Sequence, residues 1–417
     1  MLNALTPRAP QAPAPLQLAR TTAEAGGGVA HLGPVAGTLR ARASLLLDAG
    51  EAPAAWLEAI LEARTTLKVA VDGLSGPGGP ETGRALAHVA SQGVRVQVLA
   101  WGPRTPEREA AIAEARQRGL LVRTLAGGAH APVGRWLVAD DRVALLGPGP
   151  QPSGRVARGG LLRLAGEAAW ELGRFFNVDW AASGGAPAAL PEPPAVFQAT
   201  HQAAVRLGGV GHGRRSGRGL LLAAVNGARR TITLAGDAVT DPDLVAALGA
   251  AQARGVSVRV LLDDAGLAPE ADWLARLGLD AASAAAASLR ARGLDVRVVA
   301  TGAVALRAAV VDEGTVVFAT APLTRAGFAA PGEWLATVQE AGLAELLAAA
   351  LTSDWETAMP VEAPRTQAAR VLALAAEAVR PALATLSRLV AGGWRLPEVR
   401  VGVVRIAGRW RLLTETR

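Results

Sequence analysis

The chain contains one order of sequence patterns twice, and this internal repeat constrains the fold more than any other feature. In each half a helical pattern leads into a short apolar strand pattern, at 63–72 and again at 228–237. A second helical pattern, for which Asp241 is the predicted N-cap in the second half, ends at Gly93 or Gly255 before a Val-x-Val strand pattern. Alternating helices and short apolar strands predict an α/β sandwich for each half.

The later part of the repeat agrees with this prediction. A third helical pattern ends at Gly119 in the first half and at Gly293 in the second half, before another strand pattern. Each half closes with a helical pattern that ends in Asp-Trp, at 179–180 and 354–355. Between these patterns lie two predicted hairpins, each a pair of apolar runs around a polar turn: 136–139 with 143–146, and 308–311 with 316–319.

The repeat also predicts the domain organisation. Residues 186–194 are too rich in proline for a helix or strand and indicate a linker, while the N-terminal residues have no continuous apolar segment and indicate a disordered arm. After the second half the pattern does not recur, and a helix around 366–391 with a following hairpin is predicted. The predicted units are an arm (1–40), a first domain (41–182), a linker (183–205), a second domain (206–358) and a basic appendix (359–417).

Composition excludes several classes of protein. The chain has 417 residues, half of them hydrophobic, which is enough for large cores. It has no cysteine, which excludes disulfides and thiolate chemistry. No run is long and apolar enough for a membrane span, so a cytoplasmic protein is expected, with the inner membrane face as a second candidate location.

Charge is concentrated at one end of the chain. Residues 361–417 contain 10 Arg and 4 Glu, which is 10 − 4 = +6 of the total formal charge of +7. Attraction to nucleic acid or to an anionic membrane is therefore expected mainly in the appendix. Lys68 is the only lysine, which we attribute to coding bias, so an arginine is accepted wherever a family pattern would have lysine.

The duplicated layout, with its Gly-Val-x-Val strands and closing Asp-Trp, resembles the phospholipase D superfamily, and the cardiolipin-synthase-like bacterial members most of all. The resemblance covers roughly residues 43–357. In that family each half supplies one His-x-Lys-x4-Asp-x6-Gly-Ser motif, and the two motifs meet at one site. One histidine attacks phosphorus, the other protonates the leaving alcohol, and the lysines bind phosphate oxygens.

The resemblance implies that the catalytic part of this motif is lost. Val133 and Ala305 stand at the two histidine positions, and neither side chain can form a phosphoryl bond or transfer a proton. The remaining motif positions are occupied by Arg135, Asp140 and Gly147 in the first half and by Arg307, Asp312 and Thr320 in the second, with Glu333 at a family glutamate.

Arginine at the lysine positions keeps a cation and offers a fork that suits phosphate. The resemblance therefore implies a phosphate-binding cleft formed by Arg135, Arg307 and Thr320, in a catalytically inactive binding or scaffold protein for phospholipid or nucleic acid. The aspartates, Gly147 and Glu333 are expected to be structural. No cofactor or metal is expected, and the sequence does not predict an oligomeric state.

Three alternatives remain open at this point. His130, three residues before Val133, could restore a single-histidine site and give an active phosphodiesterase or phosphatidyltransferase. The appendix could bind phosphates of nucleic acid or lipid through Trp394, Arg395, Arg405, Arg409, Trp410 and Arg411. Finally, Asp140 and Asp312 also suit hairpin turns without any function, and the two motif arginines could be solvated surface charges.

Overall fold

A computed structural model describes the following residues of the chain: 37–48, 51–71, 74, 79–101, 105–125, 135–147, 158–186, 202–210, 216–236, 239–263, 286, 289–299, 304–330, 332–361, 399–406 and 409–416. Both halves of the repeat belong to one unit of the chain, Leu32–Arg417. The predicted arm therefore lies almost wholly outside the described residues.

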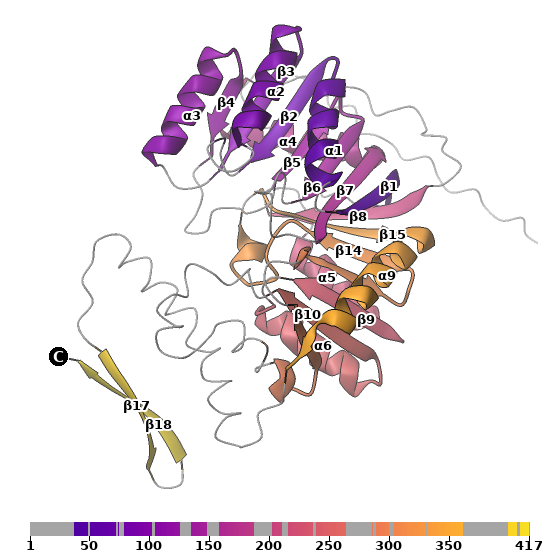
Figure 1. The fold of residues 1–417 in the computed structure, drawn as a ribbon, viewed down its shortest axis with the longest axis vertical. Coiled ribbons are helices and arrows are strands. Elements are labelled where there is room, and N and C mark those ends of the chain that lie inside the picture. Colours follow the sequence, from indigo (N-terminus) through magenta and orange to yellow (C-terminus); the bar gives the residue numbers. More distant parts are fainter. Residues whose placement is uncertain are drawn as a thin grey trace, which may run out of the picture. The chain divides into compact units, whose positions relative to one another are not determined.

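The first half contains the elements that the repeat predicts, in that order, together with two strands that it does not predict, β1 and β7 (Figure 1). They are β1 (Leu39–Asp48), α1 (Glu51–Glu62), β2 (Thr66–Val71), α2 (Gly79–Ser91), β3 (Arg95–Ala100), α3 (Pro106–Gln117), β4 (Leu121–Thr124), β5 (Arg135–Ala139), β6 (Val143–Gly147), β7 (Arg158–Gly166) and α4 (Glu167–Ala182).

Among the described residues the second half follows this order, and the range of its predicted third helix, before Gly293, lies mostly outside them. The second half contains β8 (Ala203–Gly209), α5 (Gly217–Gly227), β9 (Thr231–Gly236), α6 (Pro242–Ala253), β10 (Ser257–Asp263), β11 (Asp295–Val299), β12 (Val304–Ala305), β13 (Ala308–Val311), β14 (Thr315–Ala319), the 3-10 helix η2 (Gly327–Ala329), β15 (Trp334–Gln339), α9 (Ala341–Thr357) and β16 (Met359–Pro360). The strands β12 and β16 have no counterpart among the first-half elements. The strands β1 and β8 begin slightly inside the ranges predicted for the arm and the linker, because they pair with each other.

Local signals in the sequence explain where these helices begin and end. The carboxylate of Asp241 accepts a hydrogen bond from the backbone N–H of Leu244, so the predicted N-cap of α6 is confirmed. The predicted helix-ending residues Gly93 and Gly255 have φ of +93° and +91°, a left-handed conformation that glycine adopts without a Cβ penalty. Both halves therefore use the same terminating chemistry.

One sheet of 16 strands runs through both halves. Its two halves meet at the antiparallel pairing of β1 with β8, where Arg40 lies opposite Ala204. Outward from this pair the order is β7-β6-β5-β2-β3-β4 on one side and β15-β14-β13-β9-β10-β11 on the other, and each strand corresponds to its partner in the repeat. The predicted fold class, two tandem α/β sandwich domains related by a pseudo-twofold axis, is confirmed.

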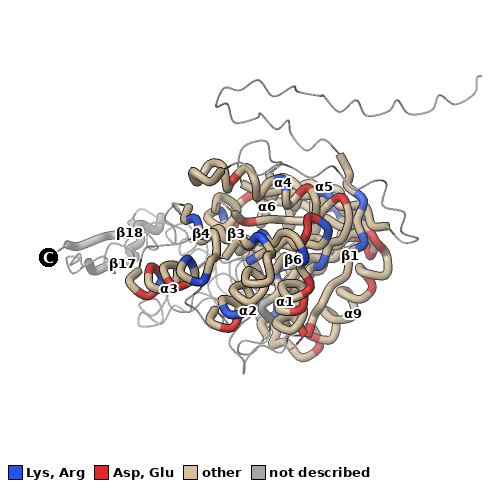
Figure 2. The backbone as a smooth tube through the Cα atoms, turned by 90° about the horizontal axis from the view of Figure 1, so that it is seen from above, with Lys and Arg blue, Asp and Glu red and all other residues tan. Residues whose placement is uncertain are grey.

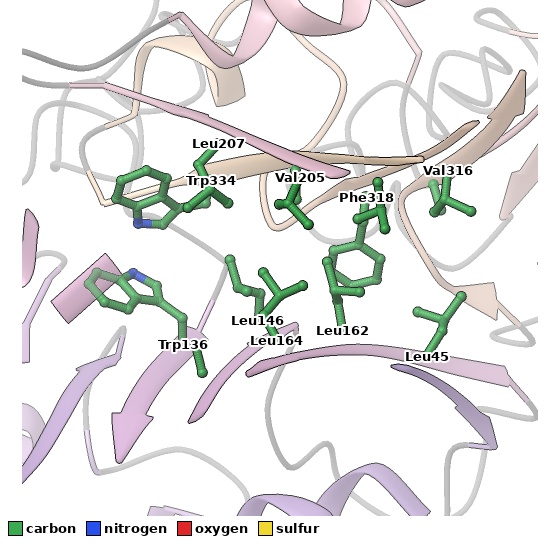
Figure 3. Packing of buried hydrophobic residues seen from close by; sticks show 14 of the residues in the cluster. Leu45, Trp136, Leu146, Leu162, Leu164, Val205, Leu207, Val316, Phe318 and Trp334 are labelled. Atoms are coloured by element: carbon green, nitrogen blue, oxygen red, sulfur yellow. The ribbon is translucent and has the colours of Figure 1, made fainter. Parts of the chain in front are cut away.

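Three apolar clusters form the core of the described part of the chain, and the largest contains side chains from both halves. The other two clusters lie where α1 and α2, or α5 and α6, cover the sheet of their own half. Between the halves, side chains of β1 and β5–β7 face those of β8, β14 and β15, as Figure 3 shows for Leu45, Trp136, Leu146, Leu162 and Leu164 opposite Val205, Leu207, Val316, Phe318 and Trp334. The junction between the halves is thus a packed hydrophobic core.

The appendix is described only as a hairpin, β17 (Val399–Ile406) with β18 (Arg409–Thr416). This confirms the predicted hairpin, while the predicted helix around 366–391 lies outside the described residues. In the described body, acidic and basic positions are interspersed, for example along α3 (Figure 2). Among the described residues no helix is long and apolar enough to cross a membrane.

Candidate functional site

The motif aspartates fix the two hairpins to the strands beside them. The carboxylate of Asp140 accepts hydrogen bonds from the backbone N–H groups of Arg64, Thr65 and Thr66, at 2.8–2.9 Å. Asp312 does the same for three backbone N–H groups at the start of β9. Both aspartates have a positive φ, 52° and 50°, in the turn of their hairpin. Turn and backbone chemistry therefore accounts for these two residues without a ligand.

These hydrogen bonds also change the acidity of the aspartates. Burial alone would raise the pKa of Asp140, but the hydrogen bonds from Thr66, Thr65 and Arg64 outweigh it and hold the pKa below its ordinary value. The pKa of Asp312 is likewise lowered, because hydrogen bonds from Arg230, Thr231 and Arg229 outweigh its desolvation. Both carboxylates are ionised at neutral pH.

Gly147 lies where the backbones of β6 and β7 approach closely. A Cβ at this position would lie 2.5 Å from the carbonyl oxygen of Gly160, so no larger residue fits without a shift. Gly160 in turn receives Leu306 of the second half, whose Cδ1 would overlap with a Cβ at Gly160. Gly147 in β6 and Gly160 in β7 thus allow the second-half motif to approach the first-half motif.

The described part of the first-half motif begins at Arg135, which pairs with Gly147 across the β5–β6 hairpin. Arg135 is 9% exposed, and it makes contacts within the protein. Its neighbour Trp136 is fully buried and donates a hydrogen bond from Nε1 to the carbonyl oxygen of Gly332, at 3.0 Å. Gly332 immediately precedes Glu333, so the start of β5 lies against the second half.

The second-half motif forms a compact set of hydrogen bonds. The guanidinium of Arg307 donates from Nη1 to the carbonyl oxygen of Thr320, at 2.7 Å. The hydroxyl of Thr320 donates to Glu333 and accepts from the backbone N–H of Trp334, at 2.8 Å. Thr320 and Glu333 are 1% and 3% exposed. Thr320 is therefore fully engaged inside the second half, and its carbonyl group orients Arg307.

Strand pairing brings the two motifs together at the junction. Strand β12, which contains Ala305, pairs in parallel with β7 of the first half, so that Ala305 lies opposite Gly159. Leu306 packs at Gly160, whose carbonyl oxygen lies close to Gly147, and Gly147 pairs with Arg135. The starts of β5 and β12, which hold the two motifs, therefore lie at the same end of the junction between the halves.

Several predicted site residues lie outside what the structure describes. Val133 and His130 fall in the undescribed segment before β5, and only the backbone of Ala305 is described. Trp394 and Arg395 are undescribed as well. Arg405, Arg409, Trp410 and Arg411 lie in the hairpin β17–β18, where Arg405 pairs with Trp410, and only their backbone is described.

A small cavity lies beside the second-half motif. It is lined by Ala319, Ala321, Glu333, Trp334 and Arg218, among others, and its 10 Å³ have room for about one water molecule. Arg218 forms ion pairs with Asp241 and Asp243, at 2.9 and 2.5 Å. Among the described residues no group of three or more His, Asp or Glu side chains could hold a metal ion.

Sequence reasoning did not identify the residues that join the halves. Trp136 and Trp334 meet edge to face with ring centroids 5.9 Å apart, and Phe175 lies 5.3 Å from Trp334. Each residue appeared only as one apolar position among many. A usable signal was the adjacency of Trp136 to Arg135 and of Trp334 to Glu333, which places an aromatic ring next to a motif residue in each half.

Comparison with known proteins agrees with this architecture. A family model described as "Cardiolipin synthase, PLD-like domain" matches residues 221–355. Phosphatidylserine synthase from Haemophilus influenzae is similar in structure, with a TM-score of 0.60 and 13% identity over 85% of this chain and 96% of that chain. Polyphosphate kinase from Porphyromonas gingivalis has a TM-score of 0.52 and 13% identity over 84% of this chain and 53% of that chain.

Nuc from Salmonella typhimurium, a phospholipase D family member, has 23% identity over 38% of this chain and 97% of that chain, with a TM-score of 0.32. A search of curated protein sequences finds no match.

Proposed function

We propose that this chain, whose second half is a phospholipase D-like domain and whose two halves share the superfamily's duplicated fold, binds a phosphate-containing ligand where the two motifs meet. In this proposal it acts as a binding or scaffold protein and does not cleave the ligand. The observation that supports it most directly is the pairing of β12 with β7, which brings the second motif onto the first half.

The cations of the proposed site are Arg135 and Arg307. A guanidinium forms two parallel hydrogen bonds to a phosphate, and such charge-assisted bonds are roughly twice as strong as neutral ones. Arg307 is held by the carbonyl oxygen of Thr320, and Thr320 is held by Glu333 and Trp334. Because these contacts already restrict the side chain of Arg307, that side chain loses less conformational entropy when the ligand binds.

Catalysis is absent from the proposal because Val133 and Ala305 carry no group that could attack phosphorus or move a proton. Arginine cannot replace them, since it stays protonated in proteins. The site would then supply electrostatic binding alone. The family description and the phosphatidylserine synthase relative make phospholipid head groups the first ligand class to test.

Vesicle flotation tests the proposal. The full chain is mixed with phosphatidylcholine vesicles that contain phosphatidylglycerol, and binding is compared for wild type, Arg135→Ala, Arg307→Ala and Arg84→Ala. Arg84 is an exposed control on α2, where it forms an ion pair with Glu81, at 3.8 Å. Losing one charge-assisted contact of about 1.5–3 kcal/mol should weaken binding by about 10- to 100-fold in the first two variants and leave the control unchanged.

The same vesicles report on catalysis. Release of free head group or transfer of the phosphatidyl group would contradict the non-catalytic proposal, and its loss in His130→Ala would then favour the single-histidine alternative. Equal binding by wild type and Arg135→Ala would contradict the proposed site.

The basic appendix is a second candidate site for polyanions. The pairing of Arg405 with Trp410 in the hairpin β17–β18 brings a cationic and an aromatic position to adjacent strands. Single-stranded DNA binding through this hairpin should weaken as salt rises, with a slope set by the number of phosphates contacted. Unchanged DNA affinity and salt dependence after deletion of residues 361–417 would exclude this candidate.

A further inference from the structure

Lys68, the only lysine of the chain, is buried inside the first half. It lies in β2, is 2% exposed, and donates a hydrogen bond from Nζ to Oδ1 of Asp141, at 2.5 Å. Asp141, the second residue of the β5–β6 turn, is 7% exposed. The two charges therefore form an ion pair within the protein interior, where each depends on the other.

Helix α4 covers this ion pair at a position that has no side chain. A Cβ at Gly173 would overlap with Oδ1 of Asp141 and would lie 3.3 Å from Nζ of Lys68. Glycine is a poor helix former, and Gly173 stands well inside the 16 residues of α4. The absent side chain at this position is what lets the helix lie against the ion pair.

The second half has the same elements without this arrangement. By the repeat, Thr233 corresponds to Lys68, Glu313 to Asp141 and Ala348 to Gly173. The side chain of Glu313 is 62% exposed and faces Arg230, at 3.4 Å. The fold shared by both halves therefore does not require the buried pair, and the pair belongs to the first half alone.

The chemistry of lysine explains why arginine does not occupy this position. The ammonium is compact, whereas a guanidinium is a wide planar fork that stays charged. Burial lowers the pKa of Lys68, and the nearby carboxylate of Asp141 only partly raises it again. Every Lys or Arg position of this chain except Lys68 is arginine, and the one lysine stands where the protein encloses the cation.

Helix α4 also carries aromatic contacts at the junction of the halves. Its residues Phe175 and Phe176 lie 5.3 Å from Trp334 and 5.8 Å from Trp136, measured between ring centroids. Trp334 belongs to the second half. Any displacement of α4 from the first-half sheet would disturb this aromatic contact.

We infer that Lys68, Asp141 and Gly173, here called the Lys68 cluster, fix α4 against the first-half sheet and thereby stabilise the aromatic contact between the halves. The inference does not depend on the proposed ligand site. It predicts that disrupting the cluster increases local opening of α4 and changes the environment of the tryptophans at the junction.

Because the chain has a single lysine, an amine-reactive reagent reports on this site alone among the side chains. The rate of acylation of Lys68 in the native full chain is measured by peptide mass spectrometry for wild type, Asp141→Asn and Glu313→Gln. We expect at least a tenfold faster reaction in Asp141→Asn, with a loss of near-ultraviolet circular dichroism from the tryptophans. Glu313→Gln, the corresponding change in the second half, should match wild type.

Gly173→Ala provides a second test, in which the direction of the change in melting temperature decides. Alanine normally stabilises a helix relative to glycine, and Gly249→Ala in α6 should raise the melting temperature because a Cβ there meets nothing within 4 Å. Gly173→Ala should lower it instead. A melting temperature raised by both changes, or equal acylation rates in wild type and Asp141→Asn, would overturn the inference. If Asp141→Asn does not fold, the two glycine variants decide.

Discussion

The contact between Gly160 and Leu306 offers a direct test of how the motifs meet. Gly160 lies in β7 of the first half, and Leu306, 1% exposed, immediately precedes Arg307. A Cβ at Gly160 would overlap with Cδ1 of Leu306 and would lie 3.2 Å from Cε2 of Phe318. Gly160→Ala should therefore destabilise the protein by about 1–3 kcal/mol through overpacking.

The reverse change opens space at the same place. Leu306→Ala removes a buried leucine and should cost about 2–5 kcal/mol, part of it from the cavity left behind. In the double variant the methyl group added by Gly160→Ala enters that cavity, so the clash disappears. The double variant should be more stable than the sum of the single effects predicts, by at least about 1 kcal/mol.

Urea denaturation followed by tryptophan fluorescence gives the free energy of unfolding of each variant. Gly83→Ala in α2 is the matched control, because a Cβ there meets nothing within 4 Å, and its effect should add to that of Leu306→Ala. Additivity of Gly160→Ala with Leu306→Ala within about 0.5 kcal/mol would show that the two residues do not touch, contrary to the packing described here.

Three further outcomes follow from the contacts described. Folding lowers the pKa of Asp140 and of Asp312. The stability that these carboxylates add to the fold is therefore complete above the ordinary aspartate pKa and is lost as the pH falls through the lowered pKa values. Asp140→Asn should accordingly flatten the acid side of a plot of melting temperature against pH. Trp136→Phe should cost about 1–3 kcal/mol in urea denaturation, since the buried carbonyl oxygen of Gly332 loses its donor. Thr320→Val should destabilise the protein by a similar amount, because it removes the hydroxyl that bonds to Glu333 and to the backbone N–H of Trp334. Thr320→Ser keeps this hydroxyl and should not.

Much of the fold was predictable because the determining signals are local. Asp241 caps its helix and Gly93 ends its helix through chemistry that spans only a few residues. The hairpin β5–β6 follows from two apolar runs around a polar turn, and the repeat confirmed the same assignment in the second half. The strand order was not predicted, because its central strands β1, β7, β8 and β15 gave no signal that the repeat search used.

The junction was not predictable, because its residues are complementary and do not repeat. In the sheet register Leu146 lies opposite Leu162 and Phe318 lies opposite Ala336, so Gly160 corresponds to Trp334. The same register position is thus a glycine in the first half and a tryptophan in the second, and Leu306 of the second half packs at Gly160. A repeat search finds similar residues, whereas packing between the halves requires dissimilar ones.

The buried ion pair was hidden for a different reason. Coding bias accounts for a rare lysine without any structural role, and the position of Lys68 in an apolar strand carries no sign of a partner 73 residues away. Asp141 stands beside Asp140 in a turn that favours aspartate in any case. Only the three-dimensional contact with Gly173 shows why one lysine stands among so many arginines.

The central functional proposal is a phosphate site shared by the two motifs. The most direct measurement is a crystal structure of the full chain soaked in inorganic phosphate. We expect one phosphate ion that accepts hydrogen bonds from the guanidinium groups of both Arg135 and Arg307. An ion bound to only one of them, or apolar side chains filling the space between them, would contradict it.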